Sequence, residues 1–240
     1  MKILLTGSVQ SFADKKGTVV LEALRKAKDG PAVETFYLKF HSDESYQAFK
    51  GRYALGDGVQ VIGLLRQVPV PIVDRVTKKP IQGSNGRDLR NSLLAVEVKE
   101  HKAVQRDELD TLYAHGIVSI VEKRELAKSA SGLSYLKARV AYNHYKRPDE
   151  EQGQADFYNL VCFGGQAESL DNLEKGQRFV IDYAVPSLDS YDMRDVAHSD
   201  GTPISRNGLE LLVREFSFLP RSAQSPDVPM SARAPEEIPF

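Results

Sequence analysis

The chain has 240 residues, of which 41% are hydrophobic and 27% are charged, and its net charge is −1. This length suits two small domains, and the composition is that of an ordinary folded protein, not of a disordered or fibrous one. No apolar run approaches the roughly 18 residues of a transmembrane helix, the opening residues contain no secretory signal, and the single cysteine excludes an internal disulfide, so we expect a reducing, cytoplasmic compartment and no membrane association.

Charge is distributed unevenly along the chain. Residues 1–105 hold 17 Lys and Arg against 11 Asp and Glu, whereas residues 106–220 hold 13 against 19. The first part is therefore basic and the second acidic, although the whole chain is nearly neutral. Such an asymmetry predicts that the two parts have different binding tasks.

The first part of the chain predicts four strands and one helix. Residues 18–27, TVVLEALRKA, are ambiguous, because Leu, Glu, Ala and Lys favour a helix while Thr-Val-Val favours a strand; we assign a strand. A helix is predicted over 42–53, where Ser42 can cap the N-terminus and Asp43 and Glu44 complement the helix dipole. The strands are predicted at residues 1–10, 18–27, 33–40 and 59–65.

A long loop, Arg66 to Arg90, follows the fourth strand. It carries only two acids, Asp74 and Asp88, against six cations: Arg66, Arg75, Lys78, Lys79, Arg87 and Arg90. A row of cations on a projecting loop is typical of a surface that binds a phosphate backbone. The alternative interpretation is a solvated basic hairpin without a ligand.

The second part of the chain repeats the order of the first. A strand begins at His115, a second spans 136–142, and residues 144–154 are a loop; then DFYNLVCF, a short helix, the stop Lys175-Gly176 and the strand QRFVIDY follow each other. This order matches TFYLKF, helix and GDGVQVIG about 120 residues earlier, so one unit is used twice. Strand, helix, glycine and strand are typical of the oligonucleotide-binding (OB) Greek-key barrel.

The stretch Asp156 to Tyr183 resembles the core of the bacterial single-stranded DNA-binding proteins. The matching positions are Phe157, Val161, Phe163, Gly164, Ala167, Glu168, Leu173, Lys175, Gly176, Phe179 and Ile181, and in the opening strand Lys2, Ile3, Leu4, Leu5, Gly7 and Val9. The chain departs from the family where Phe157 replaces Trp, where Tyr183 replaces Gly, and where the stretch from Glu168 to Leu173 is one residue shorter.

The resemblance implies the form of the family with two OB-folds per chain. The fold class is then all-β with a small α content: two tandem OB-fold barrels and a disordered tail. We expect a basic first barrel at 1–104, a linker at 105–111, a second barrel at 112–220 and a proline-rich tail at 221–240. Family members with one barrel per chain form tetramers, so two barrels per chain imply a homodimer with four OB-folds.

The resemblance also implies which aromatic rings stack on bases. The family places its contacting rings at Phe157 and Phe163, and strand parity then directs Tyr158, Leu160 and Cys162 into the barrel, which makes Cys162 a buried thiol. In the first barrel the chemistry favours Tyr37 and Lys39 on the outer face, whereas a direct alignment of the two Phe-Tyr pairs favours Phe36. Further candidates are Tyr142, Tyr145, Lys146, Arg147 and Tyr191. For any of these rings the alternative is a place in the core.

The hairpin around Tyr191 is acidic, with Asp189, Asp192, Asp195 and Asp200 against Arg194 and Arg206. Because acids repel phosphates, we expect the second barrel to bind DNA less strongly, or to use this hairpin for contacts with a subunit or partner.

The last five residues, Glu236, Glu237, Ile238, Pro239 and Phe240, resemble the acidic C-terminal tip of the same family, which docks into basic-rimmed apolar pockets on replication and repair proteins. A ring and a carboxylate on one terminal residue suit such a pocket. The resemblance therefore implies partner recruitment through this tip.

No catalytic, metal-binding or phosphate-loop pattern is present, so we expect neither an enzyme nor a cofactor. The predicted function is sequence-independent binding and protection of single-stranded DNA in replication, recombination or repair, in a bacterial, phage or plasmid-encoded, nucleoid-associated protein. Two alternatives remain open: an RNA-binding barrel protein, and a protein-interaction adaptor with little affinity for DNA.

Overall fold

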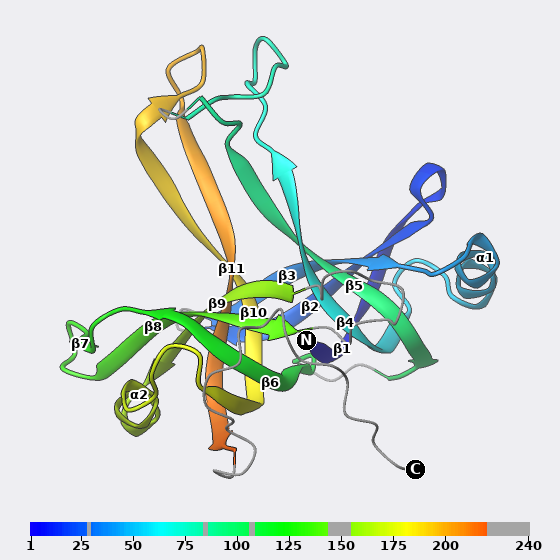
Figure 1. Ribbon diagram of the computed structural model, residues 1–240. Coiled ribbons are helices and arrows are strands. Elements are labelled where there is room, and N and C mark those ends of the chain that lie inside the picture. The colour runs from blue at the N-terminus through cyan, green and yellow to red at the C-terminus, as the bar shows by residue number, and fades with distance from the viewer. Residues whose placement is uncertain (28–29, 84–85, 106–108, 144–154, 220–240) are drawn as a thin grey trace, which may run out of the picture.

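The computed structural model describes residues 1–27, 30–83, 86–105, 109–143 and 155–219. These residues form two closed barrels, from each of which a long β-hairpin projects (Figure 1). Barrel 1 contains β1 (Lys2–Ala13), β2 (Thr18–Ala27), β3 (Gly30–Lys39), α1 (Asp43–Arg52), β4 (Gly58–Pro71) and β5 (Arg90–Ala103), with a 3-10 turn at Asp14–Lys16. Barrel 2 contains β6 (Leu112–Lys123), β7 (Ala127–Lys128), β8 (Ser134–Asn143), β9 (Ala155–Phe163), α2 (Gly165–Asp171), β10 (Arg178–Ala197) and β11 (Pro203–Phe218).

Both barrels have the strand order of an OB-fold. In barrel 1, β1 pairs with both β2 and β4, and β5 closes the barrel by pairing antiparallel with β4 and parallel with β3. In barrel 2 the same pairings link β6 with β8 and β10, and β11 with β10 and β9. Helix α1 follows β3 in barrel 1, and α2 follows the corresponding strand β9 in barrel 2. The predicted fold class, two tandem OB-fold barrels, is confirmed.

Local sequence patterns explain most of the elements. The stretch 18–27 is a strand, because Val19, Leu21 and Ala23 alternate into the core of barrel 1, and this burial outweighs the helical propensity of the intervening residues. Helix α1 begins where predicted: the hydroxyl of Ser42 accepts a hydrogen bond from the backbone N–H of Ser45. Within the described residues no helix is long and apolar enough to span a membrane.

Barrel 2 confirms the predicted strand parity. Tyr158, Leu160 and Cys162 are at most 1% exposed, and they face inward from β9. Burial raises the pKa of the Cys162 thiol to about 12, so the sulfur stays protonated at neutral pH and acts as a small apolar group.

The two barrels share one continuous sheet. Strands β1 and β6 pair antiparallel, with Ile3 opposite Ala114. A buried contact lies beside this seam, where the hydroxyl of Tyr158 in barrel 2 donates a hydrogen bond to the carbonyl of Leu65 in barrel 1 at 2.7 Å. The barrels therefore have a fixed relative position, determined by backbone pairing as well as by side chains.

The two hairpins extend well beyond the barrels. We call residues 67–93 arm 1 and residues 186–210 arm 2. Strand β4 runs to Pro71 and β5 starts at Arg90, so the predicted loop Arg66 to Arg90 is in part a two-stranded ribbon. The arms rise side by side in Figure 1 and share a small apolar cluster at their far ends, which consists of Ile72, Leu89 and Ile204 with Ile81, Met193 and Val196 against it.

Candidate nucleic-acid interface

The outer face of β9 exposes two phenylalanine rings. Phe157 is 46% exposed and Phe163 is 39% exposed, although residues of this type are normally buried. They lie on the side of the strand opposite the inward-facing residues Tyr158, Leu160 and Cys162. The predicted outward direction of both rings is confirmed, while their contact with DNA stays a prediction.

Each exposed ring has a partner on the neighbouring strand β8. The guanidinium of Arg139 lies 5.0 Å from the centroid of the Phe157 ring, a cation–π distance. Tyr135 is opposite Phe163 in the register, and the two ring centroids are 6.2 Å apart. These contacts hold the rings in place while leaving one side of them accessible, as a stacking platform requires.

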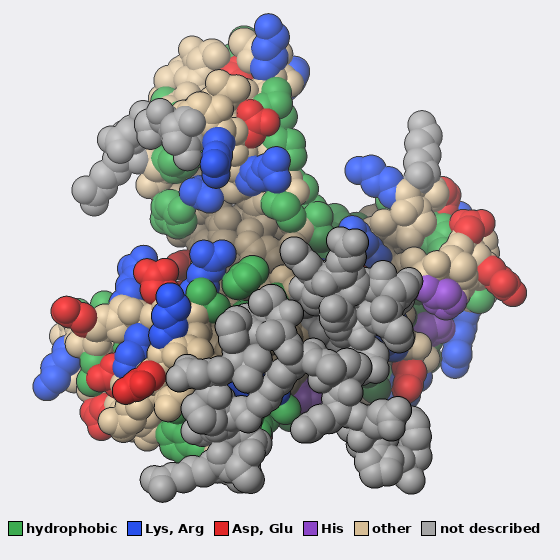
Figure 2. Space-filling model, viewed as in Figure 1, with side chains coloured by type: hydrophobic (Ala, Val, Ile, Leu, Met, Phe, Trp, Pro, Cys, Tyr) green, Lys and Arg blue, Asp and Glu red, His purple; other side chains and the backbone are tan. Residues whose placement is uncertain are grey.

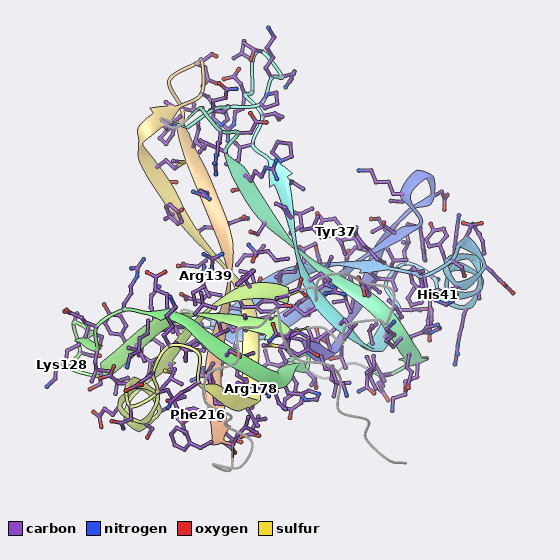
Figure 3. All side chains as sticks on the ribbon, viewed as in Figure 1. Tyr37, His41, Lys128, Arg139, Arg178 and Phe216 are labelled. Carbon is purple, nitrogen blue, oxygen red and sulfur yellow. The ribbon has the colours of Figure 1, made fainter. Side chains whose placement is uncertain are left out.

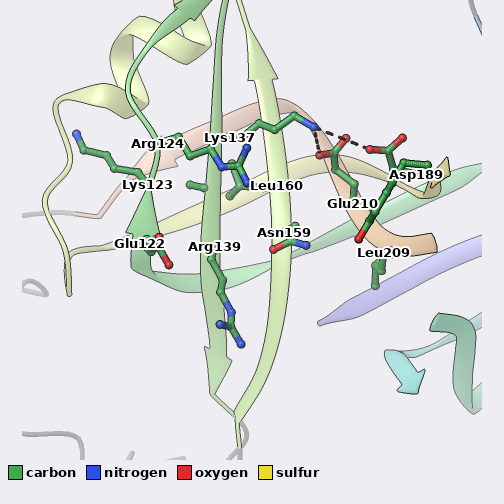
Figure 4. A pocket seen from close by; sticks show the side chains of 13 residues that line it. Glu122, Lys123, Arg124, Lys137, Arg139, Asn159, Leu160, Asp189, Leu209 and Glu210 are labelled. Atoms are coloured by element: carbon green, nitrogen blue, oxygen red, sulfur yellow. Dashed lines mark hydrogen bonds and ion pairs between the residues drawn. The ribbon is translucent and has the colours of Figure 1, made fainter. Parts of the chain in front are cut away.

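A groove with a volume of about 420 Å³ separates the β8–β9 face from arm 2 (Figure 4). Its charged lining consists of Lys123, Arg124, Lys137 and Arg139 with Glu122, Asp189 and Glu210. Lys137 pairs with Glu210 at 2.9 Å and lies 3.9 Å from Asp189, which offsets the two acids that arm 2 contributes to the groove. Among the described residues, no carboxylate pairs with Arg124 or Arg139, so these two guanidinium groups remain available to an anion.

The corresponding face of barrel 1 has a different composition. Phe36 and Leu38 are fully buried, whereas Tyr37 is half-buried and Lys39 is exposed. This parity decides between the two alternatives for β3 in favour of Tyr37 and Lys39 as the outer residues. In Figure 3, Tyr37 on barrel 1 and Arg139 on barrel 2 lie on either side of the arms.

Arm 1 presents most of the predicted cations to solvent. The exposed side chains are Arg75, Lys78, Lys79, Arg87 and Arg90. The turn that carries three of them is closed by hydrogen bonds from Lys78 N to Asp74 O and from Asp74 N to Lys79 O. Lys78 has a positive φ of 58°, within the left-handed region, so the turn has a defined shape. Figure 2 shows Lys and Arg side chains both on the arms and on barrel 2.

Two predicted site residues have other roles. Arg66 lies in strand β4 and forms ion pairs with Glu97 at 3.1 Å and Asp156 at 2.5 Å, so its guanidinium connects the barrels instead of facing a groove. Tyr142 faces inward from β8, packs against the core, and lies against the backbone of Gly116. Both residues were predicted from their positions in the sequence, but both are partly buried and packed against other parts of the chain.

The remaining predictions divide into two groups. Tyr191 is 52% exposed and lines the groove of barrel 2. The other predicted residues fall outside the described part of the chain: Tyr145, Lys146, Arg147, Glu236, Glu237, Ile238, Pro239 and Phe240.

Strand β8 contributes side chains to the candidate interface that were not predicted from the sequence. Tyr135, Lys137 and Arg139 lie on the outer face of that strand, opposite Phe163, Val161 and Asn159. The signal was available, because residues 136, 138 and 140 are apolar and their odd-numbered neighbours are aromatic or basic. No group of three or more His, Cys, Asp or Glu side chains that would suit a metal ion occurs in the described ranges.

These features define a class of surface: the outer face of an OB barrel with exposed rings, a groove and arginines beside them. No protein-family model and no curated protein matches the chain.

Among solved structures, the wild-type single-stranded DNA binding protein from Thermus aquaticus has a TM-score of 0.57 at 11% identity, covering 99% of this chain and 95% of that one. A deletion mutant of the same protein gives 0.57 at 10% identity, with 95% and 96% covered. The protein priB from Ralstonia solanacearum covers 45% of this chain and 97% of its own, at 12% identity and a TM-score of 0.29, which is too low to support an argument. At these identities the likeness to the Thermus protein establishes a shared fold of two barrels.

Proposed function

We propose that this protein binds single-stranded DNA without sequence preference and protects it during replication, recombination or repair. The observation that carries the proposal is the outer face of β8 and β9, where Phe157 and Phe163 are exposed beside Arg139. Unpaired nucleotides offer base faces and phosphates, and every base has a face on which a ring can stack, so such a surface is tolerant of sequence.

The charge distribution supports the same proposal. Arg139, which lines the groove of barrel 2, lies 5.0 Å from the Phe157 ring, and arm 1 adds further exposed cations. The solved structure that shares the fold along nearly the whole chain is named as a single-stranded DNA binding protein. Of the acids that made arm 2 unfavourable in the sequence, Asp189 lies 3.9 Å from Lys137, which offsets part of its charge.

The test is a titration of labelled oligo-dT at several salt concentrations, with competition by poly(dT) and poly(U) of equal length. We expect salt-sensitive binding and a preference for DNA. A clear preference for poly(U) would replace the proposal with an RNA-binding function. If no salt-sensitive binding of oligo-dT is measured, the protein would instead be interpreted as a protein-interaction adaptor with little affinity for DNA.

We also propose that the C-terminal tip, Glu236 to Phe240, recruits replication and repair proteins, and that two chains form a homodimer with four barrels. The first proposal rests on the acidic Ile-Pro-Phe ending and the second on the presence of two barrels in one chain. Removal of Phe240 should abolish partner binding while DNA binding persists, and unchanged partner binding would contradict the proposal for the tip.

Sedimentation equilibrium should give twice the mass of one chain, and the mass of a monomer would contradict the homodimer.

A further inference from the structure

Arm 2 extends the groove of barrel 2 toward arm 1. Asp189, Tyr191, Gly208 and Glu210 line the groove, and the register of β10 and β11 pairs Asp189 with Gly208 and Tyr191 with Arg206. Directly opposed residues of an antiparallel pair lie on the same face of the sheet. Arg206 therefore continues the groove-facing side of arm 2, beside the half-exposed ring of Tyr191.

The edge of arm 2 docks onto arm 1 at this point. The side-chain oxygen of Asn207 accepts a hydrogen bond from the backbone N–H of Ser92 at 2.8 Å, and the backbone N–H of Asn207 donates to the side-chain oxygen of Asn91 at 2.9 Å. The Nε of Arg206 donates to the carbonyl oxygen of Arg90 at 3.3 Å. Arg206 of barrel 2 and Arg90 of barrel 1 are thus neighbours at the junction of the arms.

A second contact at the far ends of the arms fixes the same arrangement. The carboxylate of Asp74 on arm 1 is 6% exposed, and it accepts hydrogen bonds from the backbone N–H of Ser199 at 2.7 Å and from its hydroxyl at 2.9 Å. Hydrogen bonds from the backbone of Thr77 and Ser199 hold the pKa of Asp74 well below its ordinary value, so this group stays ionised. Together with the apolar cluster of Ile72, Leu89 and Ile204, this contact makes the two arms one rigid unit.

The junction presents positive charge without a neutralising acid. Arg90 is exposed and Arg206 is half-buried, and in the described part of the chain neither guanidinium forms an ion pair. Asp192, the neighbour of Tyr191 in the strand, lies on the opposite face, where its carboxylate accepts a hydrogen bond from the hydroxyl of Ser205. Two guanidinium groups beside an exposed tyrosine ring match one nucleotide unit, because arginine binds phosphate and the ring stacks on a base.

We propose that Tyr191, Arg206 and Arg90 form a crossing point at which one DNA strand passes from the aromatic face of barrel 2 to the cationic arm 1. This inference rests on the proposed function and extends it: the two barrels share one continuous binding track because the arms are docked. The two sites then act as linked sites, and a strand long enough to reach both binds much more tightly than a short one.

The test compares two oligo-dT lengths in the full chain. A strand of about 8 nucleotides occupies one OB barrel, and one of about 30 nucleotides reaches both, since single OB-folds contact about 4–16 nucleotides. We expect Arg206→Glu to weaken binding of the long strand at least about tenfold while changing binding of the short strand less than about twofold, because the reversed charge repels the phosphates where the strand passes between the two sites.

The matched control is Arg214→Glu, an equal charge reversal at an exposed position on the same strand, beyond arm 2. Equal effects of Arg206→Glu and Arg214→Glu, or an Arg206→Glu variant that keeps the unmutated ratio of long-strand to short-strand affinity, would overturn the crossing point and leave the proposed function intact. Failure of the unmutated protein to bind either strand would overturn both.

Discussion

Phe157 and Phe163 show what a single side chain contributes to the candidate site. Burying a phenylalanine side chain is worth about 1.5–3 kcal/mol, so a chain that leaves two such rings exposed on one face forgoes that stabilisation. Each ring nevertheless has a partner, Arg139 or Tyr135, that restrains its orientation. Restrained rings lose little conformational entropy when a base stacks on them, and this supports a binding role for the face.

Replacing these rings tests the residue-scale proposal. We expect Phe157→Ala and Phe163→Ala each to weaken oligo-dT binding by about 1–3 kcal/mol, the range for loss of one stacked base. The control is Phe218→Ala, because Phe218 is 52% exposed but packs on Phe216, which Figure 3 shows at the end of barrel 2 away from Arg139. Binding isotherms from gel shift or anisotropy provide the measurement. Losses of equal size at Phe218 and Phe157 would remove the face from the site.

At the scale of elements, the sequence patterns predicted the positions of the strands and the side chains that face the core, because both follow from local periodicity. The alternation of Val19, Leu21 and Ala23 defines β2, and the parity of β9 separates Phe157 from Tyr158. The docking of the arms was not predictable in this way. Ile72 and Ile204 lie in segments that are 132 residues apart and show no shared pattern, and their contact depends on how far each ribbon extends from its barrel.

The ion-pair partners of charged residues in the site were equally unpredictable from the sequence. Arg66 and Arg90 looked equivalent as cations of one loop, but the structure gives Arg66 two carboxylate partners, Glu97 on the neighbouring strand β5 and Asp156 on β9 of the other barrel. Asp189 of arm 2 looked repulsive in the sequence, but β8 places Lys137 3.9 Å from its carboxylate. Whether a charged side chain can contact a ligand depends on the ion pairs that the tertiary structure forms. Composition therefore predicted the sign of the charge on each segment, but not which of its side chains are already paired.

Arm 1 offers an element-scale test. We expect the double substitution Lys78→Glu and Lys79→Glu to weaken binding uniformly across sequences and to reduce the slope of log K against log salt by about 0.7 for each phosphate that the arm no longer neutralises. Both side chains are exposed at the turn of the arm, so the fold should persist. Lys99→Glu with Lys102→Glu reverses the same charge at exposed positions at the other end of β5 and serves as the control. An unchanged slope in the arm variant would exclude arm 1 from the binding track.

At the scale of the whole molecule, the seam between the barrels determines whether the two faces keep a fixed relation. The pairing of β1 with β6 supplies backbone hydrogen bonds, and Arg66 connects Glu97 of barrel 1 to Asp156 of barrel 2. Tyr158 adds the hydrogen bond to Leu65 from a side chain that is 1% exposed. Burial, together with the neighbouring carboxylate of Asp156, raises the pKa of Tyr158 far above its ordinary value, so its hydroxyl remains a donor throughout the working pH range.

Removing that hydroxyl tests the seam without altering the shape of the core. Tyr158→Phe deprives the buried carbonyl of Leu65 of a hydrogen bond, and we expect the free energy of unfolding in urea to fall by about 1–3 kcal/mol. Tyr135→Phe is the matched control, because the Tyr135 hydroxyl has no hydrogen-bond partner in the described ranges and lies on the outer face, where the cost should stay within about 0.5 kcal/mol. Because Tyr158 connects the barrels, its loss should also weaken binding of long oligo-dT more than binding of short oligo-dT. If Tyr158→Phe were no more destabilising than Tyr135→Phe, the hydroxyl would have no part in holding the barrels together, and their fixed relation would depend on β1–β6 pairing and the docked arms alone.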